Sequence, residues 1–456
     1  MNKLNIVILA AGKGTRMHSD TPKVLHKIGA KPILAHVIDC AKKLGASRII
    51  VVYGYGGPEV RAAINDEKII WVNQAHQNGT GHAVQQAIAH LDADAKTLIL
   101  LGDVPLVDAD ACKKLVDLAA TQMAILSFNK SDPTGYGRIV RKPSGAVTAI
   151  VEHKDASVEQ RTITEVNTGI MSLPNAHLIP WLAQLNNDNA QGEYYLTDIV
   201  QIAAQQGVAV VTEITDDEWS VTGINSKQDL AQIERIYQAR IAEKLLEQGV
   251  SLKDPARIDV RGTLICGRDV EIDVNCVFEG DVSLGDHVKI SSNCVIKNTH
   301  IAARSLIAPF THIEDVQIAE DCRVGPYARL RPGTVLAAEA HVGNFVELKN
   351  TQVDTGSKIN HLSYVGDTTV GKNVNIGAGT ITCNYDGVNK YRTIIEDDVF
   401  IGSDTQLVAP ITIGHGATIA AGSTITRDAP ANQLTFCRAK EQKSIAAWKR
   451  PSKLTK

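Results

Sequence analysis

Between about residues 251 and 428, an aliphatic residue returns at every sixth position and a turn-forming or polar residue follows it. The members of this series are Val270, Val282, Val288, Val324, Val342, Val353, Val365, Val370, Ile376, Ile401, Ile413 and Ile419. A period of six is incompatible with a helix, whereas β-branched residues followed by turn formers are typical of a parallel β-helix built from hexapeptides. Three hexads complete one triangular coil, so about 170 residues predict roughly nine coils. Successive coils bury one another's aliphatic residues, which requires many stacked repeats.

The period is interrupted around residues 336–341 and, at greater length, by the segment CNYDGVNKYRT at 383–393. Insertions in a repeat fold form loops on its surface, where binding groups can gather. A histidine, His361, also departs from the pattern in the segment NHLSYVGD at 360–367. These departures are the first candidates for a binding site in this half of the chain.

The first half of the sequence follows a different pattern. Residues 1–225 alternate short apolar runs such as NIVILAA and TLILLGD with longer amphipathic stretches, which predicts an α/β domain with a Rossmann-like, mostly parallel sheet. Residues 226–248 carry apolar residues at helical spacing, with Ser226 placed to cap the start and Gly249 to end it. We therefore predict an α/β domain at 1–225, a linker helix at 226–250, and a β-helix domain with a C-terminal tail at 251–456.

Composition and charge narrow the class of protein. The 456 residues carry a net charge of −3, which gives no reason to expect nucleic acid as a partner. The eight cysteines include no CxxC pair, so we expect reduced thiols in a cytoplasmic protein. The apolar run Ile6–Ala11 is too short for a signal peptide, and no segment approaches the length of a membrane span.

The segment LAAGKGTRM at residues 9–17 directly follows an expected strand, so its backbone amides should face outward at the carboxyl end of the sheet. Its spacing fits neither a dinucleotide-binding glycine motif nor a P-loop. Gly12 and Gly14 would let backbone approach a phosphate, and Arg16 and Lys23 would supply positive charge. The same residues also suit a simple turn between strand and helix, so the segment alone leaves its function open.

This segment belongs to a series of motifs that resembles the sugar-1-phosphate nucleotidylyltransferases. The series is LAAGKGTRM with Pro22-Lys23, Gln74 with Gly79-Thr80, Gly102-Asp103-Val104-Pro105, Gly135-Tyr136-Gly137, Val151-Glu152 and Asn167-Thr168-Gly169. Together with the hexapeptide half, the whole chain is similar to the bacterial bifunctional N-acetylglucosamine-1-phosphate uridylyltransferases and glucosamine-1-phosphate N-acetyltransferases. The resemblance implies UDP-N-acetylglucosamine synthesis for peptidoglycan and lipopolysaccharide, from glucosamine-1-phosphate, N-acetylglucosamine-1-phosphate, UTP and acetyl-CoA. It also implies that the β-helix coils left-handed and that the protein is a homotrimer.

For the first domain, the resemblance implies that Arg16 and Lys23 stabilise the charge of the reacting phosphates. It assigns the following residues to the nucleotide and sugar: Leu9, Ala10, Ala11, Gly12, Lys23, Gln74, Gly79, Thr80, Leu101, Gly102, Asp103, Gly137, Glu152, Asn167 and Asn225. Asp103 and Asn225 are implied to bind Mg²⁺, which prefers oxygen ligands completed by phosphates. Asp103 also suits a turn after its strand, and Asn225 also suits a helix cap. Leu101 stands where the family commonly has a tyrosine.

In the β-helix, polar outliers point to a second site. Strand alternation predicts that Ser363 and Val365 face inward while His361 and Tyr364 face outward. Outward residues stack on successive coils, so Arg331, Lys349 and His361 are expected on one wall. The two cations would bind a sugar phosphate, and His361 would take the proton of an attacking amine.

The resemblance further implies that Tyr364, Asn375 and Asn384 contact the sugar. It implies that acetyl-CoA is bound by Ala378, Asn384, Tyr385, Ser403, Ala421 and Arg438. A surface histidine without function is the alternative for His361. Two other hypotheses compete for the whole chain: a nucleotidylyltransferase whose β-helix only oligomerises or regulates, and a structural repeat protein with a nucleotide-sensing domain.

Overall fold

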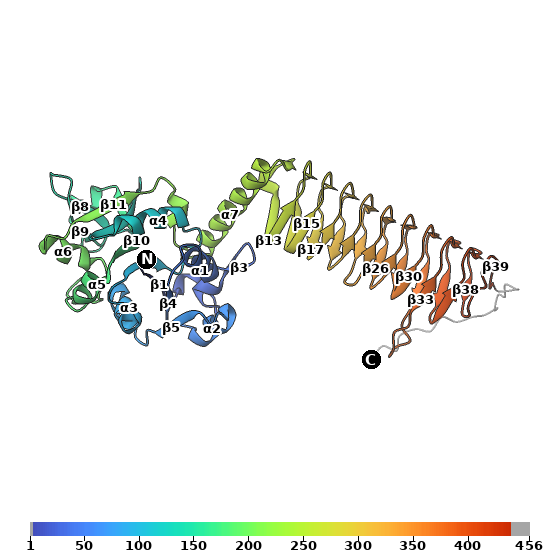
Figure 1. Cartoon of the computed structure of the whole chain (residues 1–456), viewed down its shortest axis with the longest axis horizontal. Coiled ribbons are helices and arrows are strands. Elements are labelled where there is room, and N and C mark those ends of the chain that lie inside the picture. The colour runs from blue at the N-terminus through green and yellow to red at the C-terminus, as the bar shows by residue number, and fades with distance from the viewer. Residues whose placement is uncertain (1–2, 439–456) are drawn as a thin grey trace, which may run out of the picture. The chain divides into compact units, whose positions relative to one another are not determined.

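The computed structural model describes residues 3–438, and the predicted C-terminal tail beyond Arg438 lies outside these residues. The chain forms two compact units: residues up to Tyr237 make the first, and residues from Gln238 onward make the second. Figure 1 shows a layered α/β arrangement in the first unit and a stack of regular coils in the second. No helix among the described residues is long and apolar enough to cross a lipid bilayer.

The first unit is built on a sheet whose main path of seven strands is parallel except at one strand. Its strand order is β11 (Val210–Ile214), β7 (Met123–Asn129), β10 (Glu165–Pro174), β6 (Lys96–Leu101), β1 (Leu4–Ala10), β4 (Arg48–Tyr53) and β5 (Ile69–Asn73). Strand β10 runs antiparallel to both of its neighbours, and the other neighbouring pairs on this path are parallel. The hairpin β8 (Arg138–Arg141) and β9 (Val147–Val151) attaches to β10, and β2 (Lys27–Ile28) pairs with β3 (Lys31–Pro32). The predicted mostly parallel α/β fold is confirmed.

Helices cover both faces of this sheet. They are α1 (Ile33–Lys43), α2 (Gly57–Ile64), α3 (Thr80–Ala87), α4 (Ala109–Leu118), α5 (Asn175–Leu182) and α6 (Asp198–Gln205). Alternate residues of β1 enter different cores: Ile6 and Ile8 pack with residues of α1 and α4, whereas Val7 packs with residues of α3, α5 and α6. Because both faces are covered, the exposed functional surface lies at the strand ends.

The second unit is a parallel β-helix whose strands form two extended sheets. One wall contains β12 (Ser251–Leu252), β14 (Glu271–Ile272), β16 (Lys289–Ile290), β19 (Leu306–Ile307), β22 (Arg323–Val324), β25 (His341–Asn344), β28 (Lys358–His361), β31 (Asn375–Ile376), β34 (Phe400–Ile401), β37 (Thr418–Ile419) and β39 (Leu434–Thr435). We call this sheet the first wall. The second sheet contains β13 (Ile258–Cys266), β15 (Cys276–Leu284), β17 (Val295–Lys297), β18 (His300–Ile301), β20 (His312–Glu314), β21 (Gln317–Ile318), β23 (Arg329–Leu330), β24 (Val335–Leu336), β26 (Glu347–Lys349), β27 (Gln352–Val353), β29 (Tyr364–Gly366), β30 (Thr368–Val370), β32 (Ile381–Cys383), β33 (Thr393–Ile395), β35 (Gln406–Val408), β36 (Ile411–Ile413) and β38 (Thr424–Ile425). The predicted hexapeptide architecture is confirmed.

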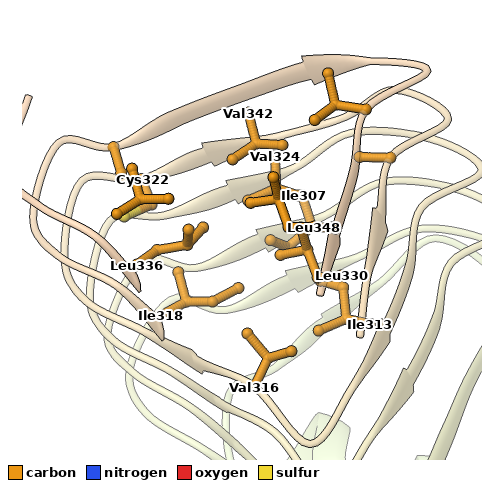
Figure 2. Close-up of a cluster of buried hydrophobic side chains, with 14 of the residues drawn as sticks. Ile307, Ile313, Val316, Ile318, Cys322, Val324, Leu330, Leu336, Val342 and Leu348 are labelled. Atoms are coloured by element: carbon orange, nitrogen blue, oxygen red, sulfur yellow. The ribbon is translucent and has the colours of Figure 1, made fainter. Parts of the chain in front are cut away.

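Each hexad sends two residues into the core, an aliphatic residue and a smaller one two positions before it. Ile318 and Val316, Val324 and Cys322, and Val365 and Ser363 are such pairs, and all of them are buried. Figure 2 shows the first two of these pairs inside the prism, together with aliphatic residues of neighbouring coils such as Leu336 and Val342. Strand alternation within each hexad explains the spacing of two, because every second side chain points to the same face.

The structure corrects one sequence expectation, the interruption around residues 336–341. Leu336 and Val342 are both buried core residues, 1% and 0% exposed, and keep the spacing of six. The three alanines and the glutamate between them hide the repeat in the sequence, but the buried positions on either side keep their places. Stacked partners lie 17 or 18 residues apart along the chain, and the eleven strands of the first wall give slightly more coils than the roughly nine expected.

The insertion at 383–393 is present as a loop between β32 and β33, so stacked partners across it lie 25 residues apart.

Helix α7 (Lys227–Glu247) begins in the first unit and ends in the second, since the division between the units falls after Tyr237. At its start, Ser226 Oγ accepts a hydrogen bond from the Asp229 amide, and the Asp229 carboxylate accepts bonds from the amides of Asn225 and Ser226. Gly249 follows with a φ of +89°. This is a capping box at one end and a glycine stop at the other.

Candidate functional sites

The glycine loop of the first unit follows β1 and leads to two short 3-10 turns, Thr15–Met17 and Lys23–Leu25. Gly14 has a φ of +62°, and a Cβ there would lie 2.7 Å from the Cβ of Lys23. Gly14 is therefore required for the close approach of Lys23, whereas a Cβ at Gly12 would meet no atom within 4 Å. The two glycines, both expected to let backbone approach a phosphate, therefore have different structural roles.

Two adjoining cavities open at the carboxyl ends of β1 and β6. The smaller has a volume of about 330 Å³, and the larger about 630 Å³. The smaller is lined by most of the residues expected to bind the nucleotide: Leu9, Ala10, Ala11, Gly12, Lys23, Gln74, Gly79, Thr80, Leu101 and Asp103. The larger is lined by those expected to bind the sugar, Gly137, Glu152 and Asn167, together with Arg16 and Asn225. Asp103 lines both cavities, so the two candidate ligand sites meet at its carboxylate.

Three of the predicted residues meet at the junction of the cavities. The Lys23 ammonium donates to Asp103 Oδ2 at 2.6 Å and to Asn225 Oδ1 at 3.1 Å. The side chains of Lys23 and Asp103 are only 11% and 21% exposed, so this ion pair is shielded from solvent. Two oxygens from distant parts of the first unit therefore converge on one cation. Arg16 lies on the wall of the larger cavity, and its guanidinium makes no ion pair with any residue that the structure describes.

The larger cavity is lined by a partly buried carboxylate, Glu152, which follows β9. Burial raises the pKa of Glu152 above its ordinary value, the hydrogen bond donated by Thr197 Oγ1 at 3.1 Å opposes this, and the nearby charges of Asp198 and Asp155 add to it. Gly137 packs against it, because a Cβ there would lie 3.4 Å from Glu152 Oε1. A carboxylate held in this way suits recognition of sugar hydroxyls.

The remaining predicted residues shape these cavities in several ways. Gln74 is buried and donates to the carbonyl of Gly79 at 3.1 Å, which orders the entrance to α3. The Gly102 amide donates to the Leu9 carbonyl at 2.9 Å and so lies under the cavity floor. Asn167 is tied to Gly137, whose carbonyl accepts a bond from its amide at 2.9 Å. Leu101, the departure from the family pattern, lines both cavities.

In the β-helix, the predicted residues do not share one wall, so that expectation is wrong. His361 ends β28 on the first wall. Lys349 ends β26 in the second sheet, and Arg331 directly follows β23, the strand that pairs with β26. Leu362 has a φ of +49° and turns the chain between them. The sequence could not fix the register, because the misread interruption at 336–341 hid the true corner positions.

His361 instead stands in a vertical column at this corner. The inward residues Val342, Ile359, Ile376, Ile401 and Ile419 are in register on successive coils. The residues two positions after them are Asn344, His361, Ala378, Ser403 and Ala421. The last three are residues expected to line the acetyl-CoA groove, and Arg438 Nε donates to the Ala421 carbonyl at 2.9 Å at the end of the same column. His361 is exposed, and Ser363 and Val365 are buried, as strand alternation predicted.

Tyr364 and Asn384 gather around Gly366 on the second sheet. A Cβ at Gly366 would lie 2.4 Å from the Tyr364 hydroxyl oxygen and 2.9 Å from Asn384 Nδ2, so glycine is required there. Asn384 is 5% exposed and donates to Asp367 Oδ2 at 2.5 Å. Tyr385 is exposed in the inserted loop, and its hydroxyl donates to the Gly387 carbonyl at 2.5 Å. Asn375, on the first wall, stacks directly after Lys358 of β28.

The chain is similar to known proteins over its full length. A model of the MobA-like NTP transferase domain matches residues 6–252, a model of the GMPPB C-terminal domain matches 260–353, and one of the bacterial transferase hexapeptide matches 392–427. The "Bifunctional protein GlmU" of Methylobacillus flagellatus is 63% identical over 455 residues, which cover 100% of this chain and 99% of that protein. The protein of the same name from Nitrosospira multiformis is 59% identical over 458 residues, with coverage of 100% and 99%. The chain belongs to the bifunctional GlmU family.

Membership of the GlmU family makes the chain a transferase with two functional domain types. The structure adds Asp367, which no motif indicated, and gives a contact to Lys390, which belongs to the inserted loop expected to carry binding groups but had no assigned role. Burial pushes the pKa of Asp367 up, but hydrogen bonds from Asn350 and Asn384 and the charges of Lys349 and Lys390 bring it below its ordinary value. The Lys390 ammonium in turn lowers the pKa of Lys349, with a further contribution from burial. Only the position of Lys390 inside the inserted loop could have drawn attention to it in the sequence.

Proposed function

We propose that this chain makes UDP-N-acetylglucosamine in two steps. It transfers acetyl from acetyl-CoA to glucosamine-1-phosphate, and then uridylyl from UTP to N-acetylglucosamine-1-phosphate with release of pyrophosphate. The product is a precursor of peptidoglycan and lipopolysaccharide. The observation that carries this proposal is the coexistence of two separate constellations in a chain related over its full length to bifunctional proteins.

For uridylyl transfer, UTP occupies the smaller cavity and the sugar phosphate the larger one. A phosphate oxygen of the sugar attacks the α-phosphorus at the junction, the bond to the bridging oxygen breaks, and pyrophosphate leaves with the electron pair. Asp103, Lys23 and Arg16 surround the place where the cavities meet. The protein needs no nucleophile for this reaction, because positioning and stabilisation of spreading negative charge supply the catalysis.

The junction also fits Mg²⁺. A carboxylate oxygen of Asp103 and an amide oxygen of Asn225 already point at one cation, the Lys23 ammonium. These are oxygen ligands of low total charge, which Mg²⁺ accepts when phosphates and waters complete its shell. The described residues hold no cluster of three or more His, Cys, Asp or Glu side chains, in keeping with a metal held largely by its nucleotide. When bound, the metal would withdraw charge from the phosphates, and Asp103 and Asn225 would hold it while Lys23 turns to a phosphate.

For acetyl transfer, His361 takes a proton from the amine of glucosamine-1-phosphate as its nitrogen attacks the thioester carbonyl. The C–S bond then breaks, and the coenzyme A thiolate leaves. Arg331 and Lys349 hold the sugar phosphate, and the column of small residues after His361 receives the thioester arm. Arg331 is held by Glu347 at 2.8 Å, which fixes the guanidinium for this purpose. Tyr364 and Asn384 contact the sugar from the second sheet.

The proposal includes a homotrimer, which is supported by an exposed aromatic ladder. The rings of Phe310, Tyr327 and Phe345 stack at 4.9 and 5.2 Å along one corner of the β-helix. They are about half exposed, and each takes a positive φ, an unfavourable conformation for a bulky residue. Large exposed apolar groups in a strained setting suit burial against a second copy. A partner there would also turn the shallow wall beside His361 into a cleft.

The proposal places the protein in the cytoplasm, because its eight free cysteines suit a reducing compartment.

The decisive experiment is to replace His361 by Ala and to assay both half-reactions. We expect acetyl transfer to fall by roughly 10²-fold or more, as for a lost general base, while uridylyl transfer stays at the wild-type rate. Gln352→Leu, an exposed outward residue of β27, serves as the control. Acetyl transfer that survives in His361→Ala, or that is absent from the unaltered protein, would leave the β-helix as an oligomerising module only.

A further inference from the structure

One residue that no motif singled out contacts the candidate base directly. Asn344, in β25, lies one coil before His361 and is its register partner. Its Oδ1 atom lies 2.8 Å from His361 Nδ1, and its backbone carbonyl accepts a bond from the Leu362 amide at 3.0 Å. Asn344 therefore fixes both the ring of His361 and the backbone of the corner that follows it.

The chemistry of this contact determines which ring nitrogen is free. An amide oxygen only accepts hydrogen bonds, so Nδ1 of a neutral His361 must carry the proton and donate it. The lone pair is then left on Nε2, the nitrogen at the far end of the ring. A general base needs an unprotonated nitrogen aimed at the substrate, and a partner on Nδ1 is the usual means of selecting that tautomer.

The neutrality of Asn344 has a further consequence. A carboxylate in its place would stabilise the imidazolium and keep the ring protonated at neutral pH. On the first wall, His341 of the coil before His361 is the register partner of Arg323 on one side and of Lys358 on the other. Burial lowers the pKa of His341, and the charges of Arg323, Lys358 and His361 lower it further. The neutral Asn344 is therefore the group that the structure shows on the His361 ring itself.

We propose that Asn344 is the positioning residue of the acetyl-transfer site, holding His361 in the tautomer whose Nε2 accepts the proton of the substrate amine. This rests on the proposed function of His361 as the base. Asn344 itself touches no reacting atom and acts only through the ring.

Two variants separate the two properties of Asn344. Asn344→Leu removes the hydrogen-bond acceptor but keeps a side chain of similar size. We expect kcat for acetyl transfer to fall about 10- to 100-fold, the range seen when a residue that orients a functional histidine is lost. The KM for glucosamine-1-phosphate should change little. Asn344→Asp keeps the acceptor and adds charge. Its activity should recover at high pH, and the acidic limb of its pH–rate profile should move up by about one pH unit, because the imidazolium is stabilised. Uridylyl transfer and the control Gln352→Leu should be unaffected.

A direct readout comes from nitrogen NMR of ¹⁵N-histidine-labelled protein, with the His361 signals assigned from His361→Ala. The wild type should show His361 protonated on Nδ1, and Asn344→Leu should move the proton to Nε2. If His361→Ala abolishes acetyl transfer but both Asn344 variants keep the wild-type kcat, pH profile and tautomer, the positioning role is wrong while the proposed function stands. If His361→Ala is active, the proposed function fails first.

Discussion

The two candidate sites are built in opposite ways. In the first unit, residues from the β1 loop, β6, β9, β10 and the start of α7 meet around two adjoining cavities of one chain, and the ion pair of Lys23 and Asp103 is shielded from solvent. In the second unit, the candidates form columns on an exposed prism. His361 stands on the first wall, while Arg331 and Lys349 stand on the second sheet.

This difference follows from the folds. A doubly covered sheet leaves its strand ends as a natural depression, in which loops of unequal length can close around a ligand. A repeat fold presents the same positions on every coil, so it makes stripes and ridges rather than clefts. Water is excluded from such a surface only when something covers it. The first site should therefore depend on single residues inside its cleft, and the second on the assembly as well.

The largest expected effect tests the self-contained site. Asp103→Asn keeps the shape and one acceptor but loses the charge shared with Lys23. We expect uridylyl transfer to fall about 10³-fold, as for loss of a preorganised charge at the reacting centre, with acetyl transfer unchanged. Rates of both half-reactions measure this, and Asp110→Asn on α4 is the matched control. A tenfold effect or less would mean that Asp103 is only a turn residue at the end of β6.

The β-helix fold was predictable from the sequence itself, whereas the residues of the first site were predictable only in part. The buried pairs such as Val316 and Ile318 recur so regularly that the β-helix was predictable from their spacing alone. The gathering of Asp103, Lys23 and Asn225 was predictable only through family resemblance, because these residues lie far apart in the sequence and meet by tertiary packing.

Contacts across coils could not be predicted, because they depend on the register. Asn344 and His361 meet because their coil takes 17 residues, and coils of 17 and 18 residues follow one another in no regular order along the prism. A 17-residue coil is marked in the sequence only by two buried aliphatic residues that lie five residues apart instead of six, as Leu348 and Val353 do. For the same reason the predicted common wall of His361 and Lys349 was wrong. The stacking of Phe310 on Tyr327 likewise depends on corner conformations, at φ +59° and +55°, that bulky residues rarely adopt.

A smaller effect tests whether the second site depends on assembly. Tyr327→Asp places a charge in the middle of the aromatic ladder, and aspartate tolerates the left-handed conformation at φ +55° better than tyrosine does. The change should therefore spare the coil and disrupt burial of the ladder. We expect a smaller species by light scattering and acetyl transfer reduced by about tenfold or more, because like-charged residues would then face each other across a symmetric contact.

Uridylyl transfer should stay at the wild-type rate in the same preparation, and Tyr327→Phe should behave as the wild type in both assays. A protein of unchanged mass that has lost acetyl transfer would show that the ladder acts within one chain. A monomer with full acetyl transfer would show that the exposed wall is sufficient without a partner, and the contrast between the two sites would disappear.

The smallest expected effect concerns Glu152 in the larger cavity, whose ionised carboxylate serves sugar binding but lowers the stability of the fold. Because burial, opposed by Thr197, holds the pKa of Glu152 above its ordinary 4.5, the folded state keeps this proton to a higher pH than the unfolded chain does. The contribution of Glu152 to stability is thus lost as pH rises from about 4.5 through the raised value, the opposite sign to a salt-bridged carboxylate. Glu152→Gln should remove this dependence of stability on pH. Its melting temperature, measured by calorimetry, should therefore exceed that of the wild type at pH 7 and match it near pH 4.

The same variant tests substrate binding. The KM for the sugar phosphate should rise severalfold, as for one lost charged hydrogen bond, with kcat little changed. Exposed Glu159→Gln should alter neither quantity, and a melting temperature for Glu152→Gln below the wild type at pH 7 would mean that a cation or an ordered water compensates the buried carboxylate.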